Sequence, residues 1–446
     1  MTADITIEGF LEKGEAFGTY SAPNRLPATV SVRGAMVGET VRVQLFRKRK
    51  GTYDAKLLDV LEPSKVRQKP RCIHFGQCGG CMWQHIPYEE QLNIKSDRIN
   101  ALFPYAKDKI KPIIGCDTPW NKRNKMEFSF GKFDSLGLYR AKSSGHIIDL
   151  NECHLCPEWF LIALNEARNW QKQHALPHYH PSSNGGLLRT LTLRHGFRTN
   201  EKMIILTVAG DKDFPQIAWD DFSHRMKKNF PDAAIFIRRH ILAKGIPTRF
   251  EEIALTEKTT LIEKLVLPNQ ELNFTLSPMS FFQPNPSQAE QLYALALDML
   301  ELKGDETLYD LFCGTATLSL FAAQRVKKVI GVELNPEAVQ DARRNAQDNT
   351  LPNVTIIEAD VAKFLEDEPS IDCVLIDPPR CGLGPKAVEW LIKAHPKKIL
   401  YISCNPYTQA TDCLEFKKAG YKIQSIQPVD QFPNTAHCEN IILLSK

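Results

Sequence analysis

The 446-residue sequence lacks any uninterrupted apolar run close to the ~18 residues of a membrane-spanning helix. Its first residues, Met1–Ile5, have neither the basic start nor the apolar segment of a signal peptide. Internal repeats and low-complexity segments are also absent. These absences argue against membrane, secreted and repeat proteins, so we expect a cytoplasmic protein with no membrane partner.

The sequence also has little net charge. Its formal charge of +4 is too small to indicate a nucleic-acid partner by itself. Between Arg42 and Arg71, however, ten basic residues stand against three acidic ones. A local basic excess is typical of surfaces that bind phosphate backbones, and a merely solvated basic face is an equally good reading of this segment.

The chain is too long for one hydrophobic core and should form two or three domains. Residues 1–63 alternate short β-like segments with turn residues, which is typical of a small closed β-barrel of the oligonucleotide-binding kind. Residues 68–268 predict a central α+β domain with a sizeable sheet. In residues 270–446 strands alternate with helices, which predicts a Rossmann-like α/β domain with a doubly wound parallel sheet of seven strands.

Twelve cysteines in a cytosolic chain are more often ligands, nucleophiles or buried thiols than disulfide partners. Cys72, Cys78 and Cys81 are close in sequence and separated by glycines, so their sulfurs can turn toward one point. Cys153 and Cys156 are both candidates for a fourth ligand. Four thiolates suit zinc or an iron–sulfur cluster, and the spacing departs from the paired C-x-x-C of zinc ribbons, which favours the cluster.

Acidic residues follow successive strands of the C-terminal region. The loop 310–317 opens a helix, but Ala316 occupies the second glycine position of a dinucleotide loop, so a cofactor without a pyrophosphate, such as S-adenosylmethionine, is favoured. Glu333 ends the second strand and can bind ribose hydroxyls. Asp360, after the third strand, can meet the adenine amino group, and Asp377 ends the fourth.

Cys404 follows the apolar run 398–403 and precedes Asn-Pro, a pattern typical of a buried strand that stops at a turn. By itself it would be a buried thiol. Glu439 lies just before the last predicted strand, 440–444, and in this topology both strand ends can share one cleft. Beside a methyl donor, Cys404 would add to C6 of a uracil, C5 would take the methyl group, and Glu439 would remove the C5 proton.

The sequence resembles the RNA uracil-5-methyltransferase family, specifically its iron–sulfur branch acting on 23S ribosomal RNA. The resemblance covers nearly the whole chain and rests on a TRAM-like turn at 14–18, the cysteine motif at 72–81 and motifs at 123–128, 281–285, 310–314, 377–380, 403–406 and 437–439. It implies S-adenosylmethionine contacts from Gln283, Phe312, Glu333 and Asp377, with Cys404 as nucleophile and Glu439 as base. It also implies a four-iron–four-sulfur (4Fe-4S) cluster on Cys72, Cys78, Cys81 and Cys153.

Two residues depart from the family pattern: Ala316, where glycine is common, and Pro284, where an aliphatic residue is usual. Three other functions stay open. An amino-methyltransferase would use an acidic Pro-Pro motif without needing Cys404, a transfer-RNA uracil methyltransferase would share the chemistry, and a non-enzymatic iron–sulfur protein would only bind RNA. We expect a monomer that acts on 23S rRNA after the target base has left its stack.

Overall fold

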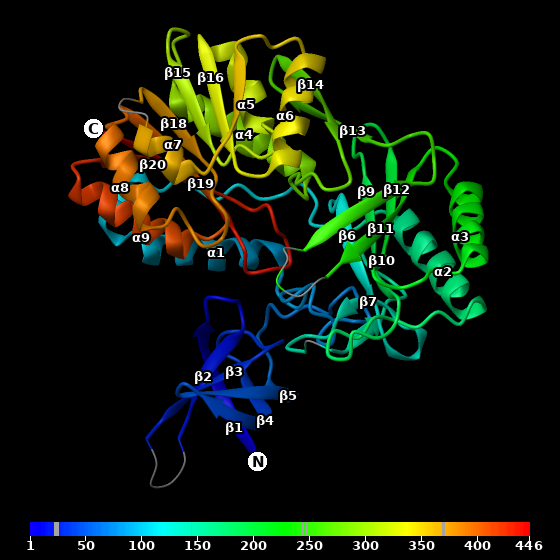
Figure 1. The fold of residues 1–446 in the computed structure, drawn as a ribbon. Helices are drawn as coiled ribbons and strands as arrows, with labels where there is room; N and C mark the ends of the chain where they lie inside the picture. Colours follow the sequence, from blue (N-terminus) through cyan, green and yellow to red (C-terminus); the bar gives the residue numbers. More distant parts are fainter. Residues whose placement is uncertain (22–25, 144, 243–244, 246–247, 368–370) are drawn as a thin grey trace.

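The computed structural model describes residues 1–21, 26–143, 145–242, 245, 248–367 and 371–446. Along the chain it forms a closed barrel, a central seven-stranded sheet and a C-terminal seven-stranded sheet, with a two-stranded hairpin between the two sheets. Figure 1 shows the barrel at the bottom, the central sheet at the right and the C-terminal sheet at the upper left. No helix in the described ranges is long and apolar enough to cross a membrane.

The N-terminal barrel closes in the strand order β1-β2-β3-β5-β4. Alternate residues of a strand point to the same face, so residues such as Ile5, Ile7, Val41 and Val43 fill the barrel interior. The predicted small barrel is therefore confirmed. Its strands are β1 (Thr2–Phe10), β2 (Ala16–Tyr20), β3 (Ala28–Val32), β4 (Thr40–Arg49) and β5 (Thr52–Glu62).

The central sheet has the order β12-β11-β10-β9-β6-β7-β8 and carries two long helices on one face. Phe160, Trp170 and Phe222 of these helices pack against sheet residues such as Leu191 and Ile204. This arrangement confirms the predicted α+β architecture. The elements are β6 (Lys125–Phe130), η2 (Lys132–Asp134), β7 (Leu136–Tyr139), β8 (Ile147–Asp149), α2 (Glu158–Gln173), β9 (Leu188–His195), β10 (Lys202–Ala209), α3 (Gln216–Asn229), β11 (Ala234–Ile241) and β12 (Arg249–Ala254).

The C-terminal sheet has the order β17-β16-β15-β18-β19-β21-β20. Its helices divide between the two faces: α4, α5 and α6 pack in one apolar core, and α7, α8 and α9 in the other. The elements are α4 (Pro286–Leu300), β15 (Thr307–Leu311), α5 (Thr317–Ala322), η3 (Ala323–Arg325), β16 (Lys328–Glu333), α6 (Pro336–Asp348), β17 (Val354–Glu358), α7 (Val361–Asp367), β18 (Cys373–Ile376), α8 (Pro385–Ala394), β19 (Lys398–Ser403), α9 (Pro406–Lys418), β20 (Lys422–Val429) and β21 (Glu439–Ser445).

The prediction of a wholly parallel sheet is wrong at its last strand. β21 lies between β19 and β20 and runs antiparallel to both. The segment 430–438, which joins β20 to β21, contains no helix. A parallel partner needs a long crossover connection, whereas a short loop reverses the chain direction. This reversal brings the start of β21 to the sheet edge where the other strands end.

Two segments that begin in the predicted central region pack on the C-terminal part. Helix α1 (Tyr88–Leu102) and the turn η1 (Pro104–Lys109) contribute Ile99, Phe103 and Ala106 to the core under α8 and α9. The hairpin β13 (Leu261–Leu267) and β14 (Gln270–Leu276) joins the core of α4, α5 and α6. Residues from outside the C-terminal α/β elements thus belong to its apolar cores, and the linear domain limits stay predictions.

Candidate active site

The carboxyl ends of the parallel strands bring several predicted site residues to one edge of the C-terminal sheet. Leu311 of β15 pairs with Ile376 of β18, which in turn pairs with Tyr401 of β19. Asp377 follows directly after β18, and Cys404 comes shortly beyond Tyr401. Open α/β sheets bind their ligands outside this edge. The fold therefore gathers these side chains where a substrate and a cofactor can meet.

Cys404 and Glu439 are neighbours across two adjacent strands. In the antiparallel pair of β19 and β21, Ser403 is opposite Asn440. Cys404 and Glu439 are the next residues outward on the two strands, so they face each other at the sheet edge. Asn405 fixes the turn, because its side chain accepts a hydrogen bond from the Tyr407 amide at 3.2 Å and donates one to the Arg380 carbonyl at 2.9 Å.

The surroundings of Cys404 and Glu439 favour the protonated form of each side chain. Desolvation, together with the nearby charges of Glu439 and Asp377, raises the pKa of the half-buried Cys404 thiol to about 11, and Arg380 opposes this shift. Glu439 is only 3% exposed, and burial followed by the charge of Asp377 raises its pKa well above the usual value. Its Oε2 has no hydrogen-bond partner among the described residues. This buried carboxyl oxygen thus keeps its capacity to accept a proton or a hydrogen bond.

The loop after β15 holds Glu333 in place. The Glu333 carboxylate accepts hydrogen bonds from the amides of Gly314 at 3.0 Å and Asn335 at 2.8 Å. Phe312, Gly314 and Ala316 all have positive φ angles of 67°, 56° and 62°. A left-handed backbone costs a residue with a Cβ about 1–2 kcal/mol. Ala316 therefore carries a conformational strain that glycine would avoid. The loop is bent tightly over the strand end that carries Glu333.

Asp310 lies beneath this loop and is only 2% exposed. The Ser319 hydroxyl donates a hydrogen bond to its Oδ2 at 2.5 Å. Burial raises the pKa of Asp310 to about 7, and the charges of Asp377 and Glu333 add to the shift. These mutual effects indicate that Asp310, Glu333 and Asp377 lie close together at the strand ends.

Asp360 and Gln283 make hydrogen bonds with residues outside this group. Asp360 is exposed, and its Oδ1 accepts a hydrogen bond from the Lys363 amide at 3.1 Å, at the start of α7. Gln283 is buried, and its Oε1 accepts from Gln431 Nε2 at 3.3 Å. Its carbonyl accepts from Asn124 Nδ2 at 3.0 Å. Among the described residues, neither side chain lines the cavity that holds Cys404.

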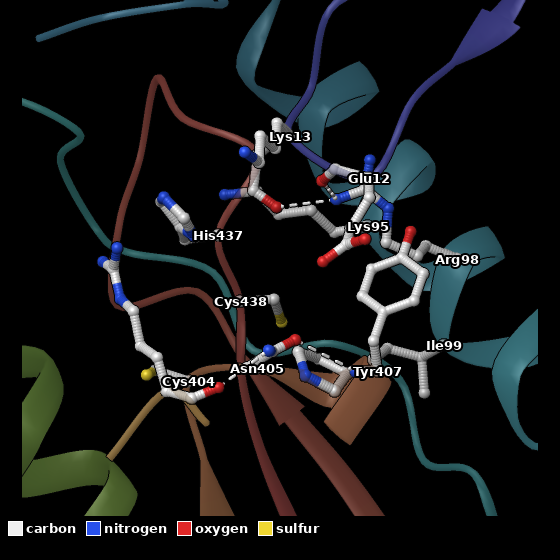
Figure 2. A pocket seen from close by; sticks show the side chains of 13 residues that line it. Glu12, Lys13, Lys95, Arg98, Ile99, Cys404, Asn405, Tyr407, His437 and Cys438 are labelled. Carbon is white, nitrogen blue, oxygen red and sulfur yellow. Dashed lines mark hydrogen bonds between the residues drawn. The ribbon is translucent and has the colours of Figure 1, made fainter. Parts of the chain in front are cut away.

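A cavity of about 180 Å³ opens beside Cys404. Figure 2 shows that its walls come from distant parts of the chain. Sequence reasoning missed Lys13 before β2, Lys95 and Arg98 on α1, and Tyr407 on α9. Lys13 stands next to the glycine-flanked turn at 14–18, which was the one available signal. The charged residues of α1 resemble those of any surface helix, so nothing in the sequence marks them.

The predicted cluster cysteines gather at a second, smaller cavity of about 20 Å³. It is lined by the thiols of Cys72, Cys78, Cys81 and Cys153, whereas Cys156 does not line it. Burial raises the pKa of Cys81 to about 12, and the charges of the other three thiols add to the shift. Within the described ranges, no group of three or more His, Cys, Asp or Glu side chains has the arrangement that a metal ion needs. The four cysteines therefore share one cavity, but their side chains do not form a closed set of metal ligands.

Comparison with known proteins identifies the family. The family model described as tRNA (Uracil-5-)-methyltransferase matches residues 240–446. An uncharacterized RNA methyltransferase of Protochlamydia amoebophila is 42% identical over 434 residues, which cover 92% of this chain and 98% of that protein. The chain belongs to the RNA uracil-5-methyltransferase family. It is therefore an enzyme, and the predicted class of RNA methyltransferase is confirmed.

A second relative supports the same assignment, and a solved structure shares the fold. An uncharacterized RNA methyltransferase of Clostridium tetani is 34% identical over 455 residues, covering all of this chain and 96% of that protein. Among solved structures, the crystal structure of Pyrococcus abyssi tRNA (uracil-54, C5)-methyltransferase in complex with S-adenosyl-L-homocysteine has a TM-score of 0.77 and 24% identity. The likeness covers 99% of both chains. The whole multidomain fold, including the barrel, is thus shared with that protein.

Proposed function

We propose that the enzyme transfers a methyl group from S-adenosylmethionine to C5 of a uridine in 23S rRNA and so forms 5-methyluridine. The observation that carries this proposal is the position of Cys404 opposite Glu439, at the ends of β19 and β21. A nucleophile and a base at one sheet edge match the two tasks of this reaction. The cavity beside Cys404 would receive the base after it leaves the RNA stack.

In the proposed mechanism the sulfur of Cys404 bonds to C6 of the uracil, and the C5–C6 double bond becomes an enolate that is nucleophilic at C5. C5 takes the methyl group from the sulfonium, and neutral S-adenosylhomocysteine leaves. Glu439 then removes the C5 proton, which restores the double bond and breaks the C6–S bond. The raised pKa of Glu439 suits this task, because its carboxylate is a stronger base than an exposed one.

The carboxylates at the strand ends would favour the binding of S-adenosylmethionine, which is cationic. With Arg380 nearby, the pKa of Cys404 is still about 11, so the thiol is mostly protonated at neutral pH. The positive sulfonium of a bound donor would further favour the thiolate. Glu333 would bind the ribose hydroxyls, and Gln283, Phe312 and Asp377 would complete the cofactor contacts. Asp360 would use its Oδ2 for the adenine amino group, since its Oδ1 already accepts from an amide at the start of α7.

We also propose a four-iron–four-sulfur cluster on Cys72, Cys78, Cys81 and Cys153. The support is that these four thiols line one cavity. The spacing of these cysteines in the sequence, which departs from the paired C-x-x-C of zinc ribbons, is our reason for preferring a cluster to zinc. Anaerobically purified protein should be brown and contain iron; colourless protein with one zinc per chain would contradict the cluster.

Transfer RNA is the second candidate substrate, because the Pyrococcus abyssi protein with the same fold is a tRNA (uracil-54, C5)-methyltransferase. The presence of the barrel does not indicate whether the substrate is 23S rRNA or transfer RNA, since the Pyrococcus abyssi protein shares the whole fold, barrel included. The cysteine motif is our reason for preferring 23S rRNA, and we propose that the enzyme acts as a monomer.

The two substrates can be separated directly. Unmodified 23S rRNA and a mixture of transfer RNAs, both transcribed in vitro, would be incubated with the enzyme and S-adenosylmethionine labelled in its methyl group. We expect label in 23S rRNA, recovered as 5-methyluridine after digestion to nucleosides. Label only in transfer RNA would move the assignment to the second candidate. Label in neither RNA, or in an exocyclic amino group, would contradict the proposed function.

A further inference from the structure

The turn between β1 and β2 of the barrel lies at the catalytic cavity. Glu12 and Lys13 of this turn line the same cavity as Cys404. In the view of Figure 2 they lie at the top and Cys404 lies at the bottom. The barrel is therefore part of the cavity wall. A substrate that reaches Cys404 must pass next to a segment from the other end of the chain.

Arg98 of α1 ties this turn to the loop that leads into β21. Its Nη1 donates hydrogen bonds to the carbonyls of Glu12 at 3.2 Å and Ala436 at 2.9 Å. Its Nη2 donates to the Leu11 carbonyl at 3.1 Å. The guanidinium also lies 5.9 Å from the ring centre of Tyr407, which follows Asn405 in the catalytic turn. One side chain thus joins the barrel, α1 and both strands of the catalytic edge.

Apolar packing holds the turn in the same place. Gly14 has a φ of +90°, and a Cβ at this position would lie 2.4 Å from the Cβ of Ala436. The Trp83 indole donates a hydrogen bond to the Gly14 carbonyl at 2.9 Å. Phe10 packs against Trp83, with ring centres 5.3 Å apart. The turn is therefore docked closely against the loop that precedes Glu439.

The four cations of the cavity differ in what they already bind. Lys95 is fully buried and pairs with Asp430 at 2.7 Å. Arg98 is committed to three carbonyls. Arg380 lies close enough to Cys404 to lower its pKa. Lys13 is exposed, and no carboxylate in the described part of the chain forms an ion pair with it. Its ammonium is free to bind an anion that enters the cavity.

We propose that the turn Leu11–Gly14 completes the catalytic pocket and that Lys13 binds the phosphate of the uridine that is flipped toward Cys404. A base that swings out of its stack brings its own phosphate to the rim of the pocket. Lysine binds phosphate as a compact point charge. The barrel then has a second task beside general RNA binding, because it holds the target nucleotide itself. This inference rests on the proposed function for the identity of the flipped base.

The test compares Lys13→Ala, Lys13→Arg and, as a matched control, Lys228→Ala, which removes an exposed lysine from α3 on the far side of the central sheet. Filter binding of in vitro transcribed 23S rRNA at several salt concentrations gives the slope of log affinity against log salt. Loss of one phosphate contact should reduce this slope by about 0.7–0.9. Single-turnover methylation is measured with whichever RNA the wild-type enzyme methylates.

We expect Lys13→Ala to reduce the slope by this amount and to lower the single-turnover rate at limiting RNA about tenfold. Lys13→Arg should restore both, and Lys228→Ala should match the wild type. A wild-type slope and rate for Lys13→Ala would overturn the inference. Wild-type enzyme that methylates neither RNA would overturn the proposed function instead, and the salt slope, which needs no methyl transfer, would still decide whether Lys13 contacts phosphate.

Discussion

Cysteines line two cavities of the protein, and the two cavities differ in size and in the charge of the residues around the thiols. The cavity at Cys404 has a volume of about 180 Å³ and is lined by charged residues of both signs, including Arg380, Lys13 and Glu12. The cavity at Cys72, Cys78, Cys81 and Cys153 has a volume of about 20 Å³ and is lined chiefly by thiols and apolar groups. We propose that the thiol of Cys404 attacks the substrate and that the four grouped thiols hold a cluster. On this proposal the surroundings of a cysteine, more than the residue type, decide which of the two roles it takes.

The largest expected effects come from replacing the proposed nucleophile, Cys404, and one proposed cluster ligand, Cys153. Cys404→Ala should lower methyl transfer by roughly 10⁴-fold or more, because the proposed mechanism needs the sulfur of Cys404 to form the bond to C6. Its iron content and circular dichroism should match those of the wild type. Cys153→Ala should instead lose iron, and Cys156→Ala, its matched neighbour, should keep it. Equal iron loss in both variants, or activity in Cys404→Ala, would erase the proposed distinction between the two cavities.

Removal of the base should stop the reaction one step later. Glu439→Gln keeps the shape of the side chain but cannot accept the C5 proton, so turnover should fall about 10²–10⁴-fold. A methylated enzyme–RNA adduct should then accumulate on ordinary RNA and be visible by denaturing gel electrophoresis. A slow variant without an adduct would show that Glu439 acts before Cys404 attacks.

The charge of the methyl donor should tune the nucleophile. S-adenosylmethionine is cationic and S-adenosylhomocysteine is neutral, and the two differ in bulk by one methyl group. Because a positive charge favours the thiolate, the donor should lower the pKa of Cys404 from about 11 and speed its alkylation at pH 8 about tenfold relative to the product. Mass spectrometry of the peptide that carries Cys404 measures this rate among the twelve cysteines. Equal rates with both ligands would contradict a sulfonium next to this thiol.

The smallest effect concerns stability and the buried Asp310. Its pKa is about 7 in the folded protein, against 3.8 for the free side chain, so the folded state holds a proton that the unfolded state has lost. This carboxyl therefore lowers the free energy of unfolding as pH rises from about 4 to 7, and the loss stays constant above that. Asp310→Asn should increase the free energy of unfolding at pH 8 by an amount on the order of 2 kcal/mol, seen as a higher unfolding temperature, with little difference at pH 4. An equal difference at both pH values would show that this carboxyl does not carry the shift.

The sequence predicted those parts of the site that depend on local pattern. Strand ends and turn residues marked Glu333, Asp377 and Cys404, because parallel strands bring their carboxyl ends to one edge of a sheet. The antiparallel direction of β21 was missed. It depends on the short segment 430–438 having no helix, and the ends of β20 and β21 that bound this segment were not known from the sequence. Glu439 was matched with Cys404 through its motif, and only the antiparallel direction of β21 brings the first residue of this strand to the edge where β19 ends.

The parts that escaped prediction depend on contacts between distant segments. Lys13 and Arg98 meet Cys404 only after the barrel, α1 and the loop before β21 have packed together. No periodicity or spacing in a single sequence encodes that docking. Asp360 is a different case: the pattern placed it correctly after a strand, but one of its oxygens accepts a hydrogen bond from an amide at the start of α7. A local motif shows which chemistry is present, and tertiary packing decides which side chains remain free to perform it.

The central claim is that Cys404 forms a covalent bond to the target base. RNA that carries 5-fluorouracil tests it most directly, since fluorine cannot leave C5 as a proton does and the adduct is trapped. With S-adenosylmethionine present, we predict a protein–RNA adduct whose digestion yields a methylated fluorouridine attached to the peptide that contains Cys404. An adduct on another cysteine, or no adduct on an RNA that the enzyme methylates, would contradict the account.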